Sequence, residues 1–395
     1  MRLHSFASFA GNSRQRGSFS SLTRFVSVIM YKKNEKPIVW VLLGQNGGDN
    51  AQLRNLARLI GLPYVEKQLC FNRLSKAPNI FLGPTLFSLK KSSFSLQPPW
   101  PDLLIASGKR TVPAARWVKK QSGGRTRLIH IGRPWAPLDW FDLIVTTPQY
   151  CLPKRYSVIC NTLPIICNDS QRLRQEAQKW SEQFRALPRP WIVLLAGGTS
   201  RPFTFGTQTA ITLGRAMSSF AHGHGGSLLV TASRRCSPAS FLALAGAIDC
   251  PSYIHNPHDK GQENPYFAYL SLADMFVVTC DSVSMISEAC LMHRPVFIFD
   301  LPVKYDLKMR VALFLKSILH KKEDSASDLG SGIYEFLVDC GLLTSTRDLR
   351  LFHEVLIEKG QIARFGEINN LLAPTFSNSQ ELQATCARIK DLLKK

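Results

Sequence analysis

The chain lacks any long apolar segment. No run of apolar residues in its 395 positions approaches the roughly 20 that a helix needs to cross a bilayer, so we expect no transmembrane span. None of its ten cysteines has the C-x-x-C spacing, and neither a metal-ligand spacing nor a Ser/His/Asp set is visible. We therefore expect buried, reduced thiols in a reducing compartment, without a zinc site or a disulfide framework.

Acidic residues are scarce. The chain has 28 Asp and Glu against 49 Lys and Arg, a formal net charge of +21. Such a surface attracts polyanions: nucleic acid, an anionic membrane face or phosphorylated ligands. No zinc-finger or RNP-type motif is present, and the basic residues are spread along the chain rather than gathered in one block. We therefore expect anionic ligands and a loose attraction to anionic membranes, in preference to nucleic acid.

The usual nucleotide-binding fingerprints are also missing. The segment 44–50 is rich in glycine and follows an apolar run, but it matches neither G-x-G-x-x-G nor G-x-x-x-x-G-K-[ST]. A dinucleotide cofactor and P-loop hydrolysis are therefore not expected, and no cofactor is predicted. The segment predicts either a tight strand-to-helix turn or a loop that contacts a ligand through Gly47, Gly48 and Asn50. Asp49 is the candidate general base.

The length suits two domains. Residues 1–36, rich in Ser and Arg and without an acidic residue before Glu35, are either a targeting segment or the product of a start codon placed too early. We expect a first domain over 37–187 and a second over 188–302, divided at the proline-bracketed stretch 187–190. Residues 303–395 are expected to form a helical extension that crosses back onto the first domain.

Both halves alternate apolar runs with stretches of helical spacing. This alternation predicts an α/β fold of two facing, doubly wound, Rossmann-like domains. The expected strands are 38–43, 64–69, 102–106, 126–131, 141–145 and 157–160 in the first half, and 191–195, 226–231, 275–279 and 295–299 in the second.

The stretch 279–289 is the main candidate for a ligand site. It follows the apolar run 275–278 and carries short polar residues where a helix should begin; these are Asp281, Ser282 and Ser284, with Met285 in the same turn. The backbone N–H groups and the positive end of a helix dipole would face a ligand above the sheet edge. Glu288, further along the helix, could accept a hydrogen bond from a sugar hydroxyl. The alternative is an ordinary helix that these side chains cap.

Other strand ends carry similar residues. Gly197, Gly198 and Ser200 follow a strand of the second half and would suit a diphosphate, to which Ser233 and Arg234 after the next strand could contribute. Arg234 is otherwise a surface charge. In the first half, Gly108 and Arg110 form a third such turn, whereas 132–135 and 147–149 resemble structural turns. Together these turns predict a cleft for a nucleotide sugar, with no metal.

Several sequence blocks resemble the mitochondrial fission ELM family, whose bacterial members are often labelled predicted nucleoside-diphosphate-sugar epimerases. The resemblance covers roughly residues 37–302. The blocks are Gly48–Gln52, Ser122–Thr126, Gly132–Pro137, Thr146–Tyr150, Asn161–Pro164, Asn264–Tyr266 and Asp281–Met285.

That family is similar to glycosyltransferases of the GT-B fold. The resemblance implies a nucleotide-sugar donor held mainly by the second domain, with Glu288 on the ribose, and a glycine-rich loop of the first domain facing the acceptor or the diphosphate. Some GT-B enzymes place a catalytic His where this chain has Asp49, which leaves the identity of the base open.

Two hypotheses follow. The first is a GT-B-like, nucleotide-sugar-binding enzyme of the glycosyltransferase type that acts on an envelope or other glycan acceptor. The second is a non-catalytic adaptor that, like the plant members of the family, recruits a dynamin-related protein to a membrane surface. We expect a cytoplasmic protein, peripheral at a membrane, and at the mitochondrial surface if the source is eukaryotic.

Overall fold

Parallel strands dominate the computed structural model. It describes residues 36–259, 261–305, 307, 309–311, 314, 336–339, 347–367 and 377–394. Residues 1–35, and with them nearly all of the segment that the sequence sets apart, lie outside this part of the chain. Residues 38–395 form one unit, which is described here by itself.

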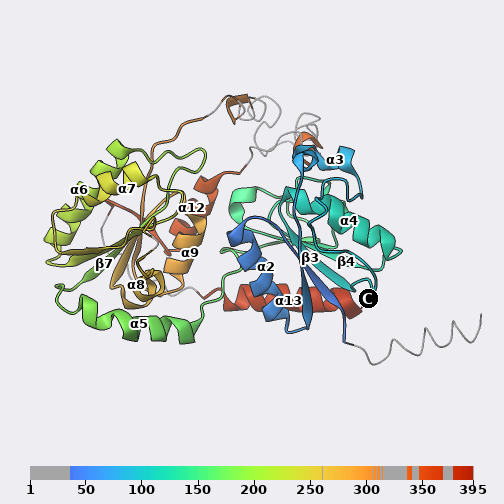
Figure 1. Ribbon diagram of the computed structural model, residues 1–395, viewed down its shortest axis with the longest axis horizontal. Coiled ribbons are helices and arrows are strands. Elements are labelled where there is room, and N and C mark those ends of the chain that lie inside the picture. Colours follow the sequence, from blue (N-terminus) through green and yellow to red (C-terminus); the bar gives the residue numbers. More distant parts are fainter. Residues whose placement is uncertain are drawn as a thin grey trace, which may run out of the picture. The chain divides into compact units, whose positions relative to one another are not determined.

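The first half contains a six-stranded sheet in the order β2-β1-β3-β4-β5-β6 (Figure 1). Every neighbouring pair is parallel, for example Val39 beside Tyr64 and Leu103. Its strands are β1 (Val39–Leu43), β2 (Tyr64–Gln68), β3 (Leu103–Ser107), β4 (Arg127–Ile131), β5 (Leu143–Thr146) and β6 (Val158–Cys160).

The second half contains another six-stranded parallel sheet, in the order β12-β11-β10-β7-β8-β9. Counted from β7, this is the 3-2-1-4-5-6 order of dinucleotide-binding folds, read from the opposite edge. Its strands are β7 (Trp191–Ala196), β8 (Ser227–Ala232), β9 (Ser252–Ile254), β10 (Met275–Thr279), β11 (Val296–Phe299) and β12 (Ala363–Arg364).

Helices connect the strands and cover the sheets, as parallel strands require. The longer described helices are α2 (Gly47–Ile60), α4 (Val112–Gln121), α5 (Ser170–Phe184), α6 (Thr207–Gly223), α7 (Pro238–Ala245), α8 (Tyr266–Leu272), α9 (Val283–Cys290), α12 (Leu349–Glu358) and α13 (Ser379–Lys394), with α3 (Asn79–Leu82) a single turn. The predicted class, an α/β fold of two Rossmann-like doubly wound halves with a helical C-terminal region, is confirmed.

Each predicted strand is present, with ends within two residues of those expected. The apolar runs predict the strands well because strands buried on both faces carry almost no polar residue. In the structure, β1, β7 and β8 are buried along their whole length. The elements not predicted are α7, the three-residue β9 and the two-residue β12, which have little periodicity to detect.

The glycine-rich segment is one difference between prediction and structure. Gly47, Gly48, Asp49 and Asn50 were expected in a turn before the helix, but they form the first turn of α2. Asn46 has extended backbone, and the Asn50 N–H donates to its carbonyl at 3.0 Å, which closes the first helical turn. Asp49 suits this position because its charge complements the helix dipole.

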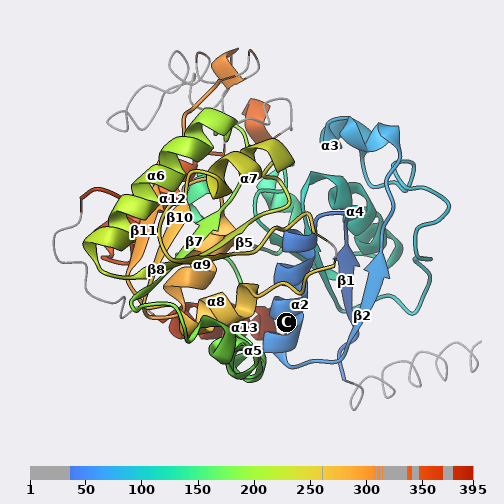
Figure 2. The ribbon, with the colours of Figure 1, turned by 60° about the vertical axis from the view of Figure 1, so that its left-hand side comes forward.

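The C-terminal region divides between the two sheets. Helix α12 contributes Leu349, Phe352 and Leu356 to the core of the second sheet, beside which β12 pairs with β11. Helix α13 lies against α2 (Figures 1 and 2), and its Leu382, Cys386 and Ile389 join the core of the first sheet. Helix α5 precedes the predicted boundary, yet Trp180 and Phe184 pack in the core of the second sheet. The domain limits themselves stay a prediction.

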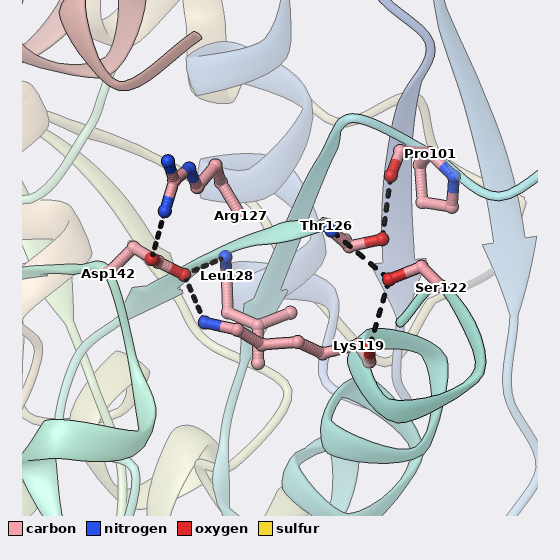
Figure 3. A network of polar contacts seen from close by, with 7 residues as sticks. All are labelled: Pro101, Lys119, Ser122, Thr126, Arg127, Leu128 and Asp142. Atoms are coloured by element: carbon pink, nitrogen blue, oxygen red, sulfur yellow. Dashed lines mark hydrogen bonds and ion pairs between the residues drawn. The ribbon is translucent and has the colours of Figure 1, made fainter. Parts of the chain in front are cut away.

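The block Ser122–Thr126 has a structural explanation. It lies where α4 ends and β4 begins, at the amino ends of the strands (Figure 3). Ser122 Oγ donates to the Lys119 carbonyl at 2.8 Å and accepts from the Thr126 N–H at 3.1 Å, and Thr126 Oγ1 donates to Pro101 O at 2.7 Å. Asp142 holds the start of β4 in place. It accepts a hydrogen bond from the Leu128 N–H at 2.8 Å and forms ion pairs with Lys119 and Arg127. This network therefore lies at the end of the sheet opposite to the carboxyl ends of its strands.

The cysteines follow the expected pattern in part. Among the described cysteines, Cys236, Cys250, Cys280, Cys290 and Cys386 are buried, whereas Cys151, Cys160 and Cys167 are exposed. Cys340 lies outside the described residues. Within the described ranges, no helix has the length and apolar character to span a bilayer.

Candidate functional site

The strand orders place a crevice at the carboxyl edge of each sheet. In open α/β sheets, ligands bind where the strand order reverses, outside the carboxyl ends of the strands. In the first sheet this point lies between β1 and β3, which lead to Gly44–Asn46 and Gly108. In the second sheet it lies between β7 and β10, which lead to Gly197 and Asp281.

A cavity of about 290 Å³, here named the central cavity, is lined by residues that follow strands of both sheets. Six residues singled out from the sequence line it: Gly48, Asp49, Ser200, Asp281, Ser282 and Ser284. The structure thus brings these six residues, which span more than 200 positions of the chain, to one cavity.

The carboxylate of Asp281 organises the wall formed by the second sheet. Its side chain is fully buried and accepts from Thr279 Oγ1 at 2.7 Å and from the Gly198 N–H at 3.1 Å. Arg235 pairs with it at 3.1 Å. Burial raises the pKa of Asp281, and the hydrogen bond from Thr279, the charge of Arg235 and the Gly198 N–H act against that rise.

This network uses amides that the sequence assigned to a diphosphate. The Gly197 N–H donates to Thr279 Oγ1 at 2.6 Å, the Gly198 N–H donates to Asp281, and Ser233 Oγ donates to the Gly197 carbonyl at 2.7 Å. The glycines are required for packing, since a Cβ on Gly197 would lie 2.0 Å from Asp281 Oδ1 and one on Gly198 would lie 2.4 Å from the Arg235 backbone. Gly197, Gly198 and Ser233 therefore hold the wall together behind the cavity.

Helix α9 opens onto the central cavity with its N-terminal end. Ser282 occupies the N-cap position, but its side chain makes no capping hydrogen bond, so the alternative of an ordinary helix capped by this residue is not observed. Asp281 is turned toward Gly198 instead. Ser282, Val283 and Ser284 line the cavity, and their end of the helix carries the positive end of its dipole. An anion in the cavity would complete the hydrogen bonding of this turn.

Two arginines that line the central cavity were missed. Arg235 lines it and Arg234 does not, although both side chains are exposed. Arg347, which precedes α12, also lines it and lies 5.7 Å from the ring centre of Tyr150. The basic character of 234–235 was visible in the sequence, but which of two adjacent arginines lines the cavity depends on the turn. Nothing in the sequence placed Arg347 there.

The turns after β4 and β5 also contribute, although they were predicted to be structural. Gly132, Thr147, Gln149 and Tyr150 line the central cavity. Gly132 has a left-handed φ of 75°, and a Cβ there would lie 3.3 Å from the Tyr150 ring. These residues follow predicted strands directly, and this position, which identified the other candidate residues, could have identified them as well.

Glu288 faces a second cavity of about 330 Å³, here named the side cavity. The two cavities adjoin, since Gly48, Gln52 and Ser284 line both. Tyr266 Oη donates a short hydrogen bond to Glu288 Oε2, and burial raises the pKa of the Glu288 carboxyl. Arg172 stacks on the Phe267 ring at 3.8 Å in the same cavity. The side cavity therefore combines a carboxylate with an apolar and a cationic face.

A third cavity of about 270 Å³, here named the edge cavity, lies at the carboxyl ends of β1 and β3. It is lined by Asp49, Asn50, Gly108 and Arg110. The Asn50 amide is occupied with the backbone of Gly44, from which it accepts at 2.9 Å and to which it donates at 3.0 Å. Arg110 donates to Gln45 at 3.0 Å. Asn50 thus shapes the turn, while Arg110 stays exposed.

Asp49 joins two of these cavities, because it lines both the central and the edge cavity. Its carboxylate accepts from Asn46 Nδ2 at 3.1 Å. Of the remaining predicted residues, Gly47, Gly197, Gly198, Ser233, Arg234 and Met285 line none of the three cavities. In the described residues, no group of three His, Cys, Asp or Glu side chains is placed to hold a metal ion.

A family model described as "Mitochondrial fission ELM1" matches residues 47–323. The mitochondrial fission protein ELM1 of Arabidopsis thaliana is 27% identical over 242 residues, 55% of each chain, so this chain spans about half the length of that relative. An uncharacterised protein of Rickettsia prowazekii, RP120, is 23% identical over 317 residues, 72% of this chain and 88% of the relative.

The solved structures that resemble the chain include a glycosyltransferase from Rickettsia africae. It is 11% identical, with 92% of this chain and 100% of that chain covered and a TM-score of 0.43. A likeness of this degree says nothing about ligands or activity. The family match spans most of the chain and includes most of the residues that line the three cavities, although Gly44–Asn46 and Arg347 lie outside it. The chain belongs to the mitochondrial fission ELM1 family, as its sequence blocks indicate.

Proposed function

We propose that this protein binds a nucleoside-diphosphate sugar across the central and side cavities and transfers the sugar to an acceptor. The observation that carries the proposal is the uncapped N-terminus of α9, which opens onto a cavity that Arg235 and Arg347 also line. Backbone N–H groups at a helix N-terminus together with guanidinium groups form a common binding site for phosphate groups.

The side cavity suits the nucleoside. It continues directly from the central cavity, and each has a volume near the lower end of the range of about 300–1,000 Å³ for ligand pockets. Glu288 would accept hydrogen bonds from the ribose hydroxyls, with Tyr266 holding its carboxylate in place. Phe267 and Arg172 provide flat faces for a base.

Asp49 is the candidate general base. It lies on the wall contributed by the first half, opposite α9, and lines the central cavity. In the transfer, an acceptor hydroxyl attacks the anomeric carbon, its proton passes to Asp49, and the bond from that carbon to the diphosphate oxygen breaks. The charge that develops on the diphosphate is stabilised by the α9 N-terminus and the two arginines.

A thermal-shift screen of the full chain against UDP-, GDP-, CMP-, ADP- and dTDP-sugars tests the donor site. A ligand at a hundred times its Kd stabilises a protein by about 2.7 kcal/mol, which raises Tm by a few degrees in a chain of this size. We expect one nucleotide to raise Tm and Glu288→Ala to abolish the rise. Glu182→Ala, at an exposed position of α5, is the matched control. No rise with any nucleotide contradicts the proposal.

Asp49→Asn separates binding from chemistry. We expect this variant to keep the Kd for the nucleotide sugar within about twofold, while release of nucleoside diphosphate slows by about 10²–10⁴-fold, the usual contribution of a general base. The measurement is a coupled assay of nucleoside diphosphate, run beside Asp139→Asn, whose side chain is exposed. An unchanged rate would exclude Asp49 as the base.

A non-catalytic adaptor is the second candidate, favoured by the name of the Arabidopsis relative, a mitochondrial fission protein. Such an adaptor would recruit a dynamin-related protein to a membrane. It predicts neither the Tm rise nor the release of nucleoside diphosphate, so the two experiments above decide between the candidates.

A further inference from the structure

A stretch that runs from the end of β2 nearly to the start of β3 contains no acidic residue. From Lys67 to Pro101 it carries five basic residues and neither Asp nor Glu, although Glu66 and Asp102 flank it. Four of the five, Arg73, Lys76, Lys90 and Lys91, are exposed. A stretch so depleted in negative charge presents a locally cationic surface.

The same segment exposes large apolar side chains. Phe81 and Phe87 are each 75% exposed, and Leu74, Ile80 and Phe94 are exposed as well. These are five of the fifteen large hydrophobic residues that are exposed within the described part of the chain, and they lie in one connection. Clusters of this kind mark interaction surfaces, because single exposed apolar residues are common but groups are not.

Internal hydrogen bonds hold these side chains in a defined arrangement. Asn72 Nδ2 donates to the Phe87 carbonyl at 2.6 Å, which joins two parts of the segment 15 positions apart, and the Leu74 N–H donates to Asn72 Oδ1 at 2.9 Å. In α3, Asn79 Nδ2 donates to the Lys109 carbonyl at 3.0 Å. The apolar side chains therefore belong to a hydrogen-bonded part of the fold, and Figure 2 shows its helix α3 beyond the carboxyl ends of β1 and β2.

We propose that the segment 70–97 is a membrane-docking surface that binds anionic lipid bilayers. Phe81, Phe87 and Leu74 would enter the interface between head groups and acyl chains, while Arg73, Lys76, Lys90 and Lys91 bind the anionic head groups. Apolar side chains rimmed by lysine and arginine fit this partner, because a bilayer surface offers apolar depth and negative charge together. The absence of acidic residues removes the repulsion that such a surface would otherwise meet.

The location has a consequence that rests on the proposed function. Phe71 and Lys109 line the edge cavity together with Asp49, so the docking surface borders the cavity that leads to the candidate base. An acceptor carried on a lipid would reach Asp49 from this side. Docking itself does not depend on any sugar transfer, and its test uses no nucleotide.

Vesicle co-sedimentation of the full chain tests the docking surface. We expect binding to equimolar phosphatidylcholine and phosphatidylglycerol to exceed binding to phosphatidylcholine alone. The variant with Phe81→Ser and Phe87→Ser should reduce the apparent partition constant for the anionic vesicles by about tenfold or more, since each phenyl ring loses its burial in the interface. Leu242→Ser, at a 66% exposed position of α7, is the apolar control and should bind like the unchanged protein.

The charges are tested in the same way. Lys90→Gln with Lys91→Gln should weaken binding to anionic vesicles by about tenfold or more and leave binding to neutral vesicles unchanged. Arg174→Gln with Arg215→Gln removes the same charge from exposed positions of α5 and α6. Equal losses in the two charge variants would show that net charge alone attracts the protein, and would overturn the proposal. So would binding that the Phe81 and Phe87 changes leave intact, or no binding at all.

Discussion

Gly197→Ala is expected to lower the free energy of unfolding by about 3–5 kcal/mol, the cost of disrupting a buried charged network. The added Cβ would lie 2.0 Å from Asp281 Oδ1, so the carboxylate has to move. It then loses the hydrogen bonds from Thr279 and Gly198 and its pairing with Arg235, while remaining in a buried site. Urea denaturation followed by circular dichroism measures the loss.

A double-mutant cycle shows whether Asp281 is the cause. In a background with Asp281→Ala the space is empty, so adding Gly197→Ala should cost about 1 kcal/mol or less. Gly47→Ala is the matched control, because a Cβ on Gly47 would meet no atom within 4 Å and Ala is the better helix former. If Gly197→Ala costs the same in both backgrounds, the steric explanation is wrong.

This network also shows what could be learned from the sequence. The apolar runs predict the sheets, and parallel sheets bring the carboxyl ends of their strands to one edge, which is why Asp49, Ser200 and Asp281 were placed near a common cleft. Their roles could not be predicted in the same way. Whether Asp281 caps α9 or binds Gly198 depends on a side-chain torsion that the packing around Gly197 decides.

Pairs distant in the chain were beyond prediction for a similar reason. The Glu288 carboxylate meets Tyr266 from another helix, 22 positions away, and Arg347 reaches the central cavity from the C-terminal region. Hydrophobic periodicity indicates which face of a helix is buried, but it does not indicate which polar side chain that face meets. The difference between Arg234 and Arg235 is the smallest case, since only one of these two adjacent residues lines the central cavity.

The membrane-docking surface illustrates the opposite situation. The stretch 79–101 has poor periodicity and predicts only a loop or short helices, and its positive charge was counted in the total for the chain. The structure shows that Phe81 and Phe87 are exposed in the same stretch as these charges. Their residue type does not predict this, because phenylalanine is usually buried. An aromatic residue in an unpatterned segment is informative only when its burial is known.

Acidification is expected to destabilise the protein through His130. The imidazole is fully buried, and burial lowers its pKa to about 4, although Nδ1 lies 3.0 Å from the Gly132 carbonyl and Nε2 lies 3.4 Å from that of Gly108. The unfolded chain binds a proton with a pKa near 6.5. The unfolded state therefore gains protons first as the pH falls, so the contribution of His130 is fully present above about pH 6.5 and is lost by about pH 4. The loss is on the order of 3 kcal/mol.

His353 acts in the same direction, because burial in α12 also lowers its pKa to about 4. Asp281 and Glu288 act in the opposite direction, since burial raises their pKa values and the folded state binds their protons more readily than the unfolded state does. The histidine contribution is therefore measured as a difference between variants. Between pH 4.5 and 6, the slope of the free energy of unfolding against pH should fall by up to about 1.4 kcal/mol per pH unit in His130→Gln. Adding His353→Gln should lower it by a similar amount again, and an unchanged slope in either variant would show that its imidazole is protonated in the folded protein.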